Sequence, residues 1–175
     1  MPNFPKTLDI RGNLWYNDYA RRKEIDEMKI WFDMDGTLAD LYAVENWLPK
    51  LRAHDASPYM DAKPLLRLCS LAKVLNRLSR EGVSIGIVSW LSKDPCPVYG
   101  KAVTDAKLEW LAKHLPSVKW DEIVIVPYGT PKSEAVGIAP HDVLFDDEEN
   151  NIIEWEEAGG WGFEPAEMME FLRAC

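Results

Sequence analysis

The chain has 175 residues, a net charge of −9 and 47% hydrophobic residues, which suits one globular domain with a substantial core. The acidic balance argues against non-specific binding to nucleic acid or anionic membranes, and the three widely spaced cysteines argue against a disulfide framework or a zinc site. No apolar run reaches the roughly 20 residues that a membrane span needs, so we expect a cytoplasmic protein that acts on a small ligand.

Residues 1–28 precede the first predicted strand, and we expect them to form an N-terminal extension to a single domain over residues 29–175. The extension holds aromatic residues and a short basic run, but it lacks the apolar centre of a signal peptide. A peripheral helix or tail is the expected form.

The first predicted strand, residues 29–34, runs through apolar side chains and then meets Asp33 and Asp35, which are followed at once by a glycine and a threonine. The segment 40–64 then separates this strand from the next predicted helix. It leaves room for one or two helices, so we expect a reduced helical cap there.

Apolar residues at helical spacing predict a helix over residues 65–82, and a continuous apolar run predicts a buried strand over 83–89. A second helix is predicted over 104–115, with Thr104 as its N-cap. The residues expected to face the core are Leu65, Leu68, Leu71, Ala72, Leu75 and Leu78 in the first helix, and Leu108, Leu111 and Leu115 in the second.

The rest of the chain continues the alternation. Strands are predicted over 122–127 and 142–146, helices over 130–137 and 150–160, and a weaker fifth strand over 159–163. None of the apolar runs alternates cleanly with polar residues, which is typical of strands covered on both faces. The pattern predicts an α/β fold with a parallel sheet and helices on both faces.

Polar residues follow several of these strands. Asp33 and Asp35 end the first and Ser89 ends the second; Asp146 ends the fourth, with Asp147 directly after it. The carboxyl ends of parallel strands meet at one edge of a sheet, where ligands bind. Lys132, at the start of the helix after the third strand, is expected to join them.

Converging carboxylates need a cation. Two unit charges about 4 Å apart repel by roughly 4 kcal/mol at an effective dielectric constant near 20. Oxygen ligands suit Mg²⁺, which takes one or two carboxylates together with waters and substrate phosphates. We expect Asp33, Asp35 and Asp146 to bind Mg²⁺ with the Met34 carbonyl, and Asp147 to orient these ligands and water.

Each feature also has a structural interpretation. "DMDG" alone is more often a turn, and a calcium loop is excluded because its sixth and twelfth positions would be Leu38 and Val44. "DDEEN" alone is a typical solvated helix start. A lone Ser89 is more often a polar strand end and a lone Lys132 a surface lysine, and it is their joint placement where strands end or helices begin that favours a site.

The same residues permit phosphoryl transfer. Asp33 is ionised at neutral pH, because a model aspartate has a pKa of about 3.9, and it can attack phosphorus to form an aspartyl-phosphate. Asp35 can protonate the leaving oxygen and later activate water. Lys132 and the Ser89 hydroxyl would stabilise charge on the phosphoryl oxygens.

The ordered set "DMDGT", "IVSW", "TPKSE" and "LFDDEEN", within residues 29–150, resembles the haloacid dehalogenase superfamily of phosphohydrolases. The resemblance implies a Rossmann-like core and Mg²⁺-dependent phosphomonoesterase activity, with Asp33 as nucleophile and Asp35 as acid and base.

Within that superfamily, "DMDGTLAD" and "LFDDEENN" are most similar to the 5′(3′)-deoxyribonucleotidases, which implies a nucleoside monophosphate substrate. The similarity also implies phosphate contacts from Ser89, Trp90 and Lys93, and contacts of Tyr42 or Trp47 with a base or sugar. The short cap departs from those nucleotidases, which carry a helical bundle between the first two strands.

Three other functions compete with this interpretation. A polynucleotide 3′-phosphatase would explain an open site, but nucleic-acid backbones need a basic groove. A receiver-like phospho-switch uses similar groups, but there the acidic pair follows the first strand and the phosphorylated aspartate follows a later one. This chain has the reverse order. A binding module that kept the site without turnover is the third alternative.

Overall fold

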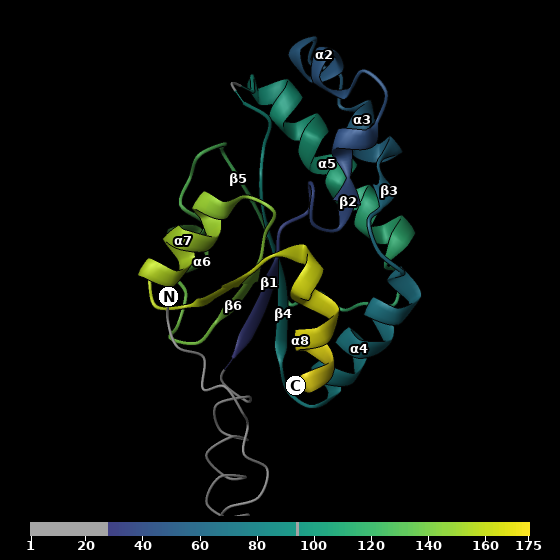
Figure 1. Cartoon of the computed structure of the whole chain (residues 1–175). Helices are drawn as coiled ribbons and strands as arrows, with labels where there is room; N and C mark the ends of the chain where they lie inside the picture. The colour runs from purple at the N-terminus through teal and green to yellow at the C-terminus, as the bar shows by residue number, and fades with distance from the viewer. Residues whose placement is uncertain (1–27, 94) are drawn as a thin grey trace, which may run out of the picture.

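The computed structural model describes residues 28–93 and 95–175 (Figure 1), so the predicted N-terminal extension, apart from Met28, lies outside the described residues. The central element is a five-stranded sheet in the order β5-β4-β1-β6-β7, with every neighbouring pair parallel. Its strands are β1 (Lys29–Phe32), β4 (Ser84–Trp90), β5 (Glu122–Val126), β6 (Val143–Phe145) and β7 (Trp161–Phe163). The predicted α/β fold class is confirmed, and the weak fifth strand is present.

The strand order reverses at β1, in the middle of the sheet. From β1 the chain builds outward through β4 to β5, and it then returns to place β6 and β7 on the other side of β1. In open parallel sheets the crevice beyond such a reversal point is where ligands bind. The residues that follow β1 and β6 therefore lie at the place where a site is expected.

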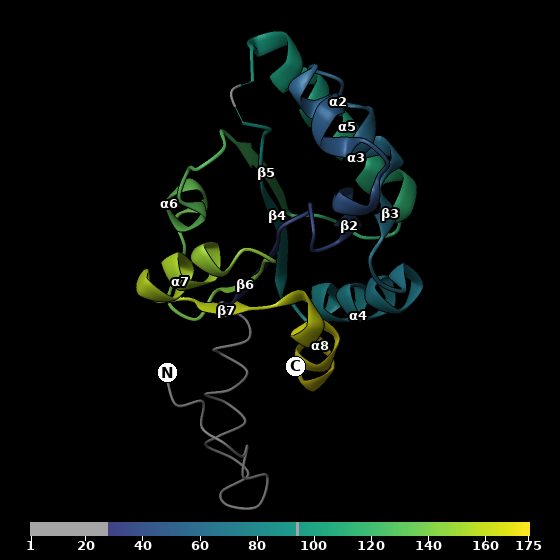
Figure 2. The same ribbon diagram turned by 45° about the horizontal axis from the view of Figure 1, so that its top comes forward.

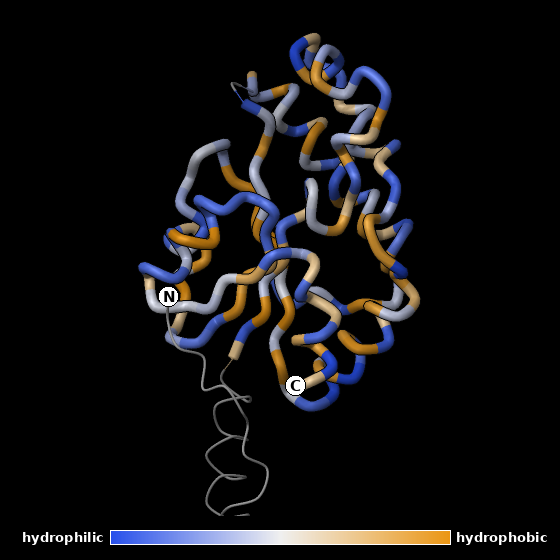
Figure 3. The backbone as a smooth tube through the Cα atoms, in the orientation of Figure 1, coloured by the Kyte–Doolittle hydropathy of each residue, from blue (hydrophilic) through white to orange (hydrophobic). Residues whose placement is uncertain are grey.

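Helices cover both faces of the sheet (Figures 1 and 2). On one face α4 (Leu68–Arg80) and α8 (Met168–Ala174) pack with Ile30 and Phe32 in the main core. On the other face Trp31 contacts a smaller cluster that includes Trp155 of α7 (Glu149–Glu157) and residues of α6 (Lys132–Val136). This alternation along β1 explains why the strand has no polar face, and Figure 3 shows the hydrophobic residues gathered in the central strands.

An insert, which we define as residues 39–64, separates β1 from α4. It holds the strands β2 (Ala39–Asp40) and β3 (Lys63–Pro64), which pair antiparallel, and between them the 3₁₀ turn η1 (Leu41–Ala43) and the helices α2 (Trp47–Arg52) and α3 (Ser57–Asp61). The insert packs against α5 (Pro97–His114) through a cluster of Leu41, Tyr59, Tyr99, Val103 and Ala106. Figures 1 and 2 show α2 and α3 beside α5, beyond one end of the sheet.

The predicted start of the first long helix was wrong. α4 begins at Leu68 because the chain just before it is extended, with β3 paired to β2 and the Leu65 N–H donating to the Leu38 carbonyl. Leu65 is consequently 44% exposed instead of facing the core. Leu71, Leu75 and Leu78 are buried as predicted.

The start of α5 was also predicted wrongly. The helix begins at Pro97, seven residues before Thr104, and the Thr104 hydroxyl donates to the Gly100 carbonyl from inside the helix. Its buried side includes Tyr99, Val103 and Trp110, while Leu108 is 40% exposed. Helix α8 was not predicted, and no helix within the described ranges is long and apolar enough to cross a membrane.

Candidate active site

A tight loop after β1 presents Asp33 and Asp35. The Asp33 N–H donates to the Phe145 carbonyl at 2.9 Å, which continues the pairing of β1 with β6. The Met34 carbonyl then accepts N–H bonds from Thr37, Leu38 and Ala39 at 2.8–3.3 Å, so the chain turns back on itself.

Gly36 allows this loop to lie against the end of β6. Its φ of +81° belongs to the left-handed region that favours glycine. A Cβ atom at this position would lie 2.1 Å from the Asp147 carboxylate and 2.7 Å from the Tyr42 ring. The glycine therefore brings Asp147 close to the loop that carries Asp33.

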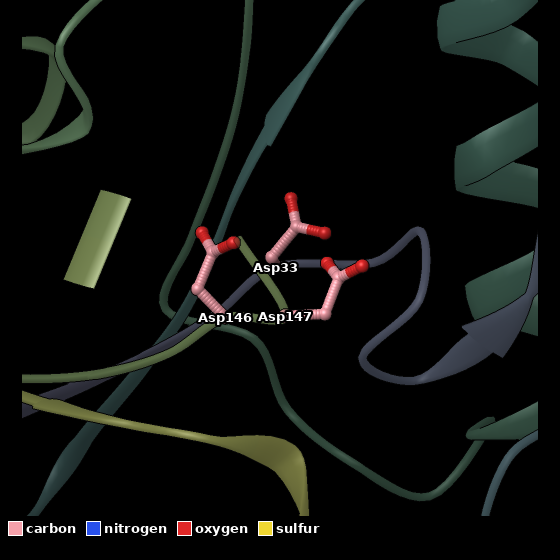
Figure 4. A group of neighbouring side chains, drawn as sticks. All are labelled: Asp33, Asp146 and Asp147. Carbon is pink, nitrogen blue, oxygen red and sulfur yellow. The ribbon is translucent and has the colours of Figure 1, made fainter. Parts of the chain in front are cut away.

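Asp33, Asp146 and Asp147 form an acidic cluster, shown in Figure 4, in which one carboxylate oxygen of each lies within 4.8 Å of the others. Asp146 is fully buried, and its N–H donates to the Phe163 carbonyl at the end of β7. Its carboxylate accepts bonds from the Glu148 N–H at 3.0 Å and the Asn151 amide at 3.1 Å. The cluster thus sits at the carboxyl ends of β1 and β6.

Lys132 lies between two of these acids. Its Nζ donates to Asp33 Oδ1 and to Asp146 Oδ2, each at 2.6 Å, and the side chain is 1% exposed. Burial alone would lower the pKa of Lys132, but Asp33 and Asp146 outweigh it and raise that pKa above its ordinary value. The lysine is charged, and its third N–H has no acceptor among the described residues.

A second buried lysine, Lys107 of α5, holds Asp35. Its Nζ donates to Asp35 Oδ2 at 2.6 Å, to the Ser89 hydroxyl at 2.8 Å and to the Trp90 carbonyl at 2.7 Å. Sequence reasoning missed this residue. The sequence signal for it is its spacing, four residues after Val103 and three before Trp110, which places it on the buried side of the helix. The predicted helix began at Thr104 instead of Pro97, so this side was not apparent.

The pKa values of the acids are raised, which favours a bound cation. Burial, reinforced by Asp33, raises the pKa of Asp146 to about 6, and burial with Asp33 and Asp146 raises that of Asp147 to about 7. Burial also raises the pKa of Asp35; Lys107 opposes this increase and Asp33 adds to it. When all three cluster acids are ionised, the one ammonium group among the described residues that pairs with them is that of Lys132.

The cluster fits a hard divalent cation, because it offers three carboxylates and Mg²⁺ prefers oxygen ligands. Its members differ from the predicted ligand set. The Met34 carbonyl already accepts three backbone N–H bonds within the turn, and its role as a metal ligand stays a prediction. The cluster contains Asp147 and not Asp35, whose carboxylate accepts a bond from Lys107.

A pocket of about 580 Å³ opens over these residues, between the sheet edge and the insert. The predicted residues Tyr42, Trp47, Trp90 and Lys93 all line it, together with Tyr59, Tyr128 and Arg52. Two pairs of aromatic rings are among its lining residues, Tyr42 with Trp47 at 5.1 Å and Trp90 with Tyr128 at 4.9 Å between centroids.

Two of the predicted phosphate-binding residues have other contacts in the structure. Ser89 is fully buried behind the pocket wall, where its hydroxyl accepts a bond from Lys107. The Trp90 indole N–H donates to the Thr130 carbonyl at 2.8 Å, so this N–H is engaged within the protein. Lys93 is exposed and lines the pocket.

No family model and no curated protein matches the sequence. Among solved structures, the chain is similar to the D,D-heptose 1,7-bisphosphate phosphatase from B. bronchiseptica in complex with magnesium and phosphate, with a TM-score of 0.51 and 13% identity over 77% of this chain and 78% of that one. The D,D-heptose 1,7-bisphosphate phosphatase from Burkholderia thailandensis gives a TM-score of 0.46 and 10% identity over 83% of this chain and 98% of that one. The first comparison shows that the chain has the same α/β fold as that phosphatase.

Proposed function

We propose that the protein is a Mg²⁺-dependent phosphomonoester hydrolase of the haloacid dehalogenase type, that it works through an aspartyl-phosphate on Asp33, and that its substrate is a nucleoside monophosphate. The observation that carries the proposal is the acidic cluster of Asp33, Asp146 and Asp147, with Lys132 between two of its members at the floor of the pocket. The shared fold with a phosphatase adds support.

Asp33 and Lys132 would handle the phosphoryl group. The Lys132 N–H that has no acceptor among the described residues would donate to a phosphoryl oxygen. Because Lys132 engages only Asp33 Oδ1, Oδ2 is left to attack phosphorus, and the bond to the leaving oxygen breaks as the new bond forms. In this scheme Asp33, Asp146 and Asp147 hold Mg²⁺, which when bound offsets the charge on the phosphoryl oxygens.

Asp35 would donate a proton in the first step of the reaction and accept one in the second. In the first step its carboxylic acid gives a proton to the leaving oxygen, and the product alcohol departs. In the second step its carboxylate takes a proton from the water that attacks phosphorus, which releases phosphate and restores Asp33. Asp35 lines the pocket, as this role requires.

The preference for a nucleotide is supported by the pocket walls. Tyr42, Trp47, Trp90 and Tyr128 are aromatic residues of the pocket lining on which a flat base would stack, and stacking of one base is worth about 1–3 kcal/mol. Lys93 also lines the pocket and is exposed, so it offers positive charge to an anionic substrate on an otherwise acidic protein.

The test is release of phosphate by the purified protein with and without Mg²⁺. The substrates are a deoxynucleoside monophosphate, a sugar phosphate and a 3′-phosphorylated oligonucleotide. We expect metal-dependent release, fastest from the nucleotide, that Asp33→Asn abolishes. Asp105→Asn, which alters an exposed aspartate of α5, serves as the control and should leave the rate unchanged.

Three results would contradict parts of this proposal. Equal rates for Asp33→Asn and wild type would rule out the covalent mechanism. Faster release from the sugar phosphate or the oligonucleotide would rule out the nucleotide preference. A long-lived phosphoprotein that does not turn over would favour a phospho-switch.

A further inference from the structure

Lys107 has the contacts of a supporting group and not of a substrate ligand. An ammonium group has three N–H donors, and those of Lys107 are matched by three acceptors at 2.6–2.8 Å, namely Asp35, Ser89 and the Trp90 carbonyl. The side chain is 1% exposed. No donor is left for a phosphate, in contrast to Lys132, which uses two of its three.

The bond from Lys107 restrains Asp35 in one orientation. Lys107 engages only Oδ2 of the carboxylate, and among the described residues no other donor bonds to either oxygen. Asp35 keeps 19% of its side chain exposed and lines the pocket, and its other oxygen, Oδ1, has no hydrogen-bond donor among the described residues. Without Lys107 the carboxylate would be free to rotate.

Lys107 is itself fixed by three parts of the fold. Ser89 and the Trp90 carbonyl hold it from the end of β4, and its own helix, α5, packs against the insert. Its Nζ also lies 5.1 Å from the centre of the Tyr59 ring in α3, a cation–π contact. The orientation of Asp35 therefore depends on the sheet, on α5 and on the insert together.

We propose that Lys107 is a positioning residue that locks Asp35 in the orientation from which it transfers a proton to and from the leaving oxygen. This inference rests on the proposed phosphomonoesterase function. It also gives Ser89 a new role, that of holding Lys107 instead of contacting the phosphate.

The kinetic test compares two leaving groups. An alkyl phosphate needs its leaving oxygen protonated, whereas p-nitrophenyl phosphate leaves as a stable phenolate and needs little acid catalysis. Lys107→Met should lower kcat for the alkyl phosphate by about 10- to 100-fold, the order of loss that a small misplacement of a catalytic group causes. It should lower kcat for the aryl phosphate by less than about threefold.

A matched control and a double-mutant cycle complete this test. Lys101→Met removes an exposed lysine that pairs with Asp105 on the same helix, and it should leave both rates unchanged. In an Asp35→Asn background, Lys107→Met should cost no more than about threefold, because a residue that acts through Asp35 has nothing left to position. Equal losses for the two substrates, or a full loss in the Asp35→Asn background, would overturn the proposal.

Folding and function are kept separate by two further measurements. Circular dichroism shows whether Lys107→Met is folded. If it is unfolded, the kinetic comparison uses the Asp35→Asn, Lys107→Met double variant and Asp35→Asn alone. The double variant leaves no buried charge of the pair unmatched. Independently of turnover, a crystal structure of Lys107→Met, or of Lys107→Gln if the methionine variant does not fold, should show the Asp35 carboxylate displaced. An undisplaced carboxylate would refute positioning, whereas a wild-type protein that hydrolyses no phosphomonoester would refute the proposed function.

Discussion

The sheet side and the insert side of the pocket are built in different ways. On the sheet side, Asp33, Asp146 and Lys132 are almost completely buried, and the two acids are tied by backbone bonds to neighbouring strands. On the insert side, Tyr42 is 46% exposed and α2, which carries Trp47, has no buried residue. We infer that the sheet side fixes the reacting groups, while the insert presents an adaptable surface that selects the substrate.

The largest effect is expected at Lys132. Lys132→Met leaves Asp33 and Asp146 buried without their cation, and breaking a buried ion pair in this way costs about 3–5 kcal/mol of unfolding free energy. The rate should also fall by about 10²–10³-fold, as when one donor to a developing anion is removed. Chemical denaturation and phosphate release measure the two effects.

The control for this variant is Lys101→Met, because Lys101 pairs with Asp105 on the surface of α5, where the lysine side chain is 75% exposed. An exposed ion pair of this kind contributes less than about 1 kcal/mol to the free energy of unfolding. If both variants lost the same stability, the contrast between a rigid, buried sheet side and an exposed surface would not hold.

A second pair of variants tests the contact between the two acidic loops. Gly36→Ala places a methyl group against Asp147 and Tyr42, and should weaken Mg²⁺ binding by about 10- to 100-fold. Gly129→Ala is the matched control, since its φ of +83° is almost the same and its Cβ would meet open space. Both should lose about 1–3 kcal/mol of stability from backbone strain, but only the first should lose metal affinity.

The pH dependence of metal binding follows from the raised pKa values of Asp147, about 7, and Asp146, about 6. Below these values the groups hold protons that a divalent ion must displace, so affinity should rise with pH up to about 7 and then level off. Isothermal titration calorimetry in buffers of different ionisation enthalpy should detect proton release at pH 6.5 and little at pH 8.5.

The same pKa values have an effect on stability. Because the folded pKa values lie above the ordinary 3.8, these carboxyls favour the folded state when protonated, and this contribution is fully present below pH 3.8 and is lost as the pH rises from there to about 6–7. The metal-free protein should therefore lose stability over this range, and Mg²⁺ should restore it. A metal-free protein that gained stability from pH 5 to 8 would contradict the arrangement of acids.

The smallest effect is expected on the insert side. Trp47→Ala should raise KM for a nucleoside monophosphate about 10-fold by removing a stacking surface, with kcat changed by less than about twofold. The same variant should bind an alkyl phosphate without a base as well as wild type does. A loss in kcat for both substrates would mean that the insert takes part in the chemistry itself.

The sheet side was largely predictable from the sequence. The buried strands appear as apolar runs, and the rule that strand ends meet at one edge predicts that Asp33, Asp146 and Lys132 lie close together. Side-chain directions were not predictable in this way. For that reason the sequence favoured Asp35 over Asp147 as a member of the acidic cluster.

The support of Asp35 by Lys107 was much less predictable. Lys107 sits on a helix whose first seven residues, 97–103, were not recognised as helical, so its burial beside Val103 and Trp110 could not be inferred. Its three partners come from β4 and from the loop after β1, which are distant in sequence. The packing of α5 brings them together, with Val103 and Ala106 against the insert and Trp110 in the main core.

The central claim is that Asp33 is the nucleophile of a Mg²⁺ site formed with Asp146 and Asp147. A crystal structure of the protein with Mg²⁺ and beryllium fluoride, a mimic of a bound phosphoryl group, tests this claim most directly. We predict beryllium bonded to an Asp33 oxygen, with Mg²⁺ coordinated by carboxylates of the acidic cluster. Beryllium fluoride on another residue, or Mg²⁺ bound away from these three aspartates, would contradict the account.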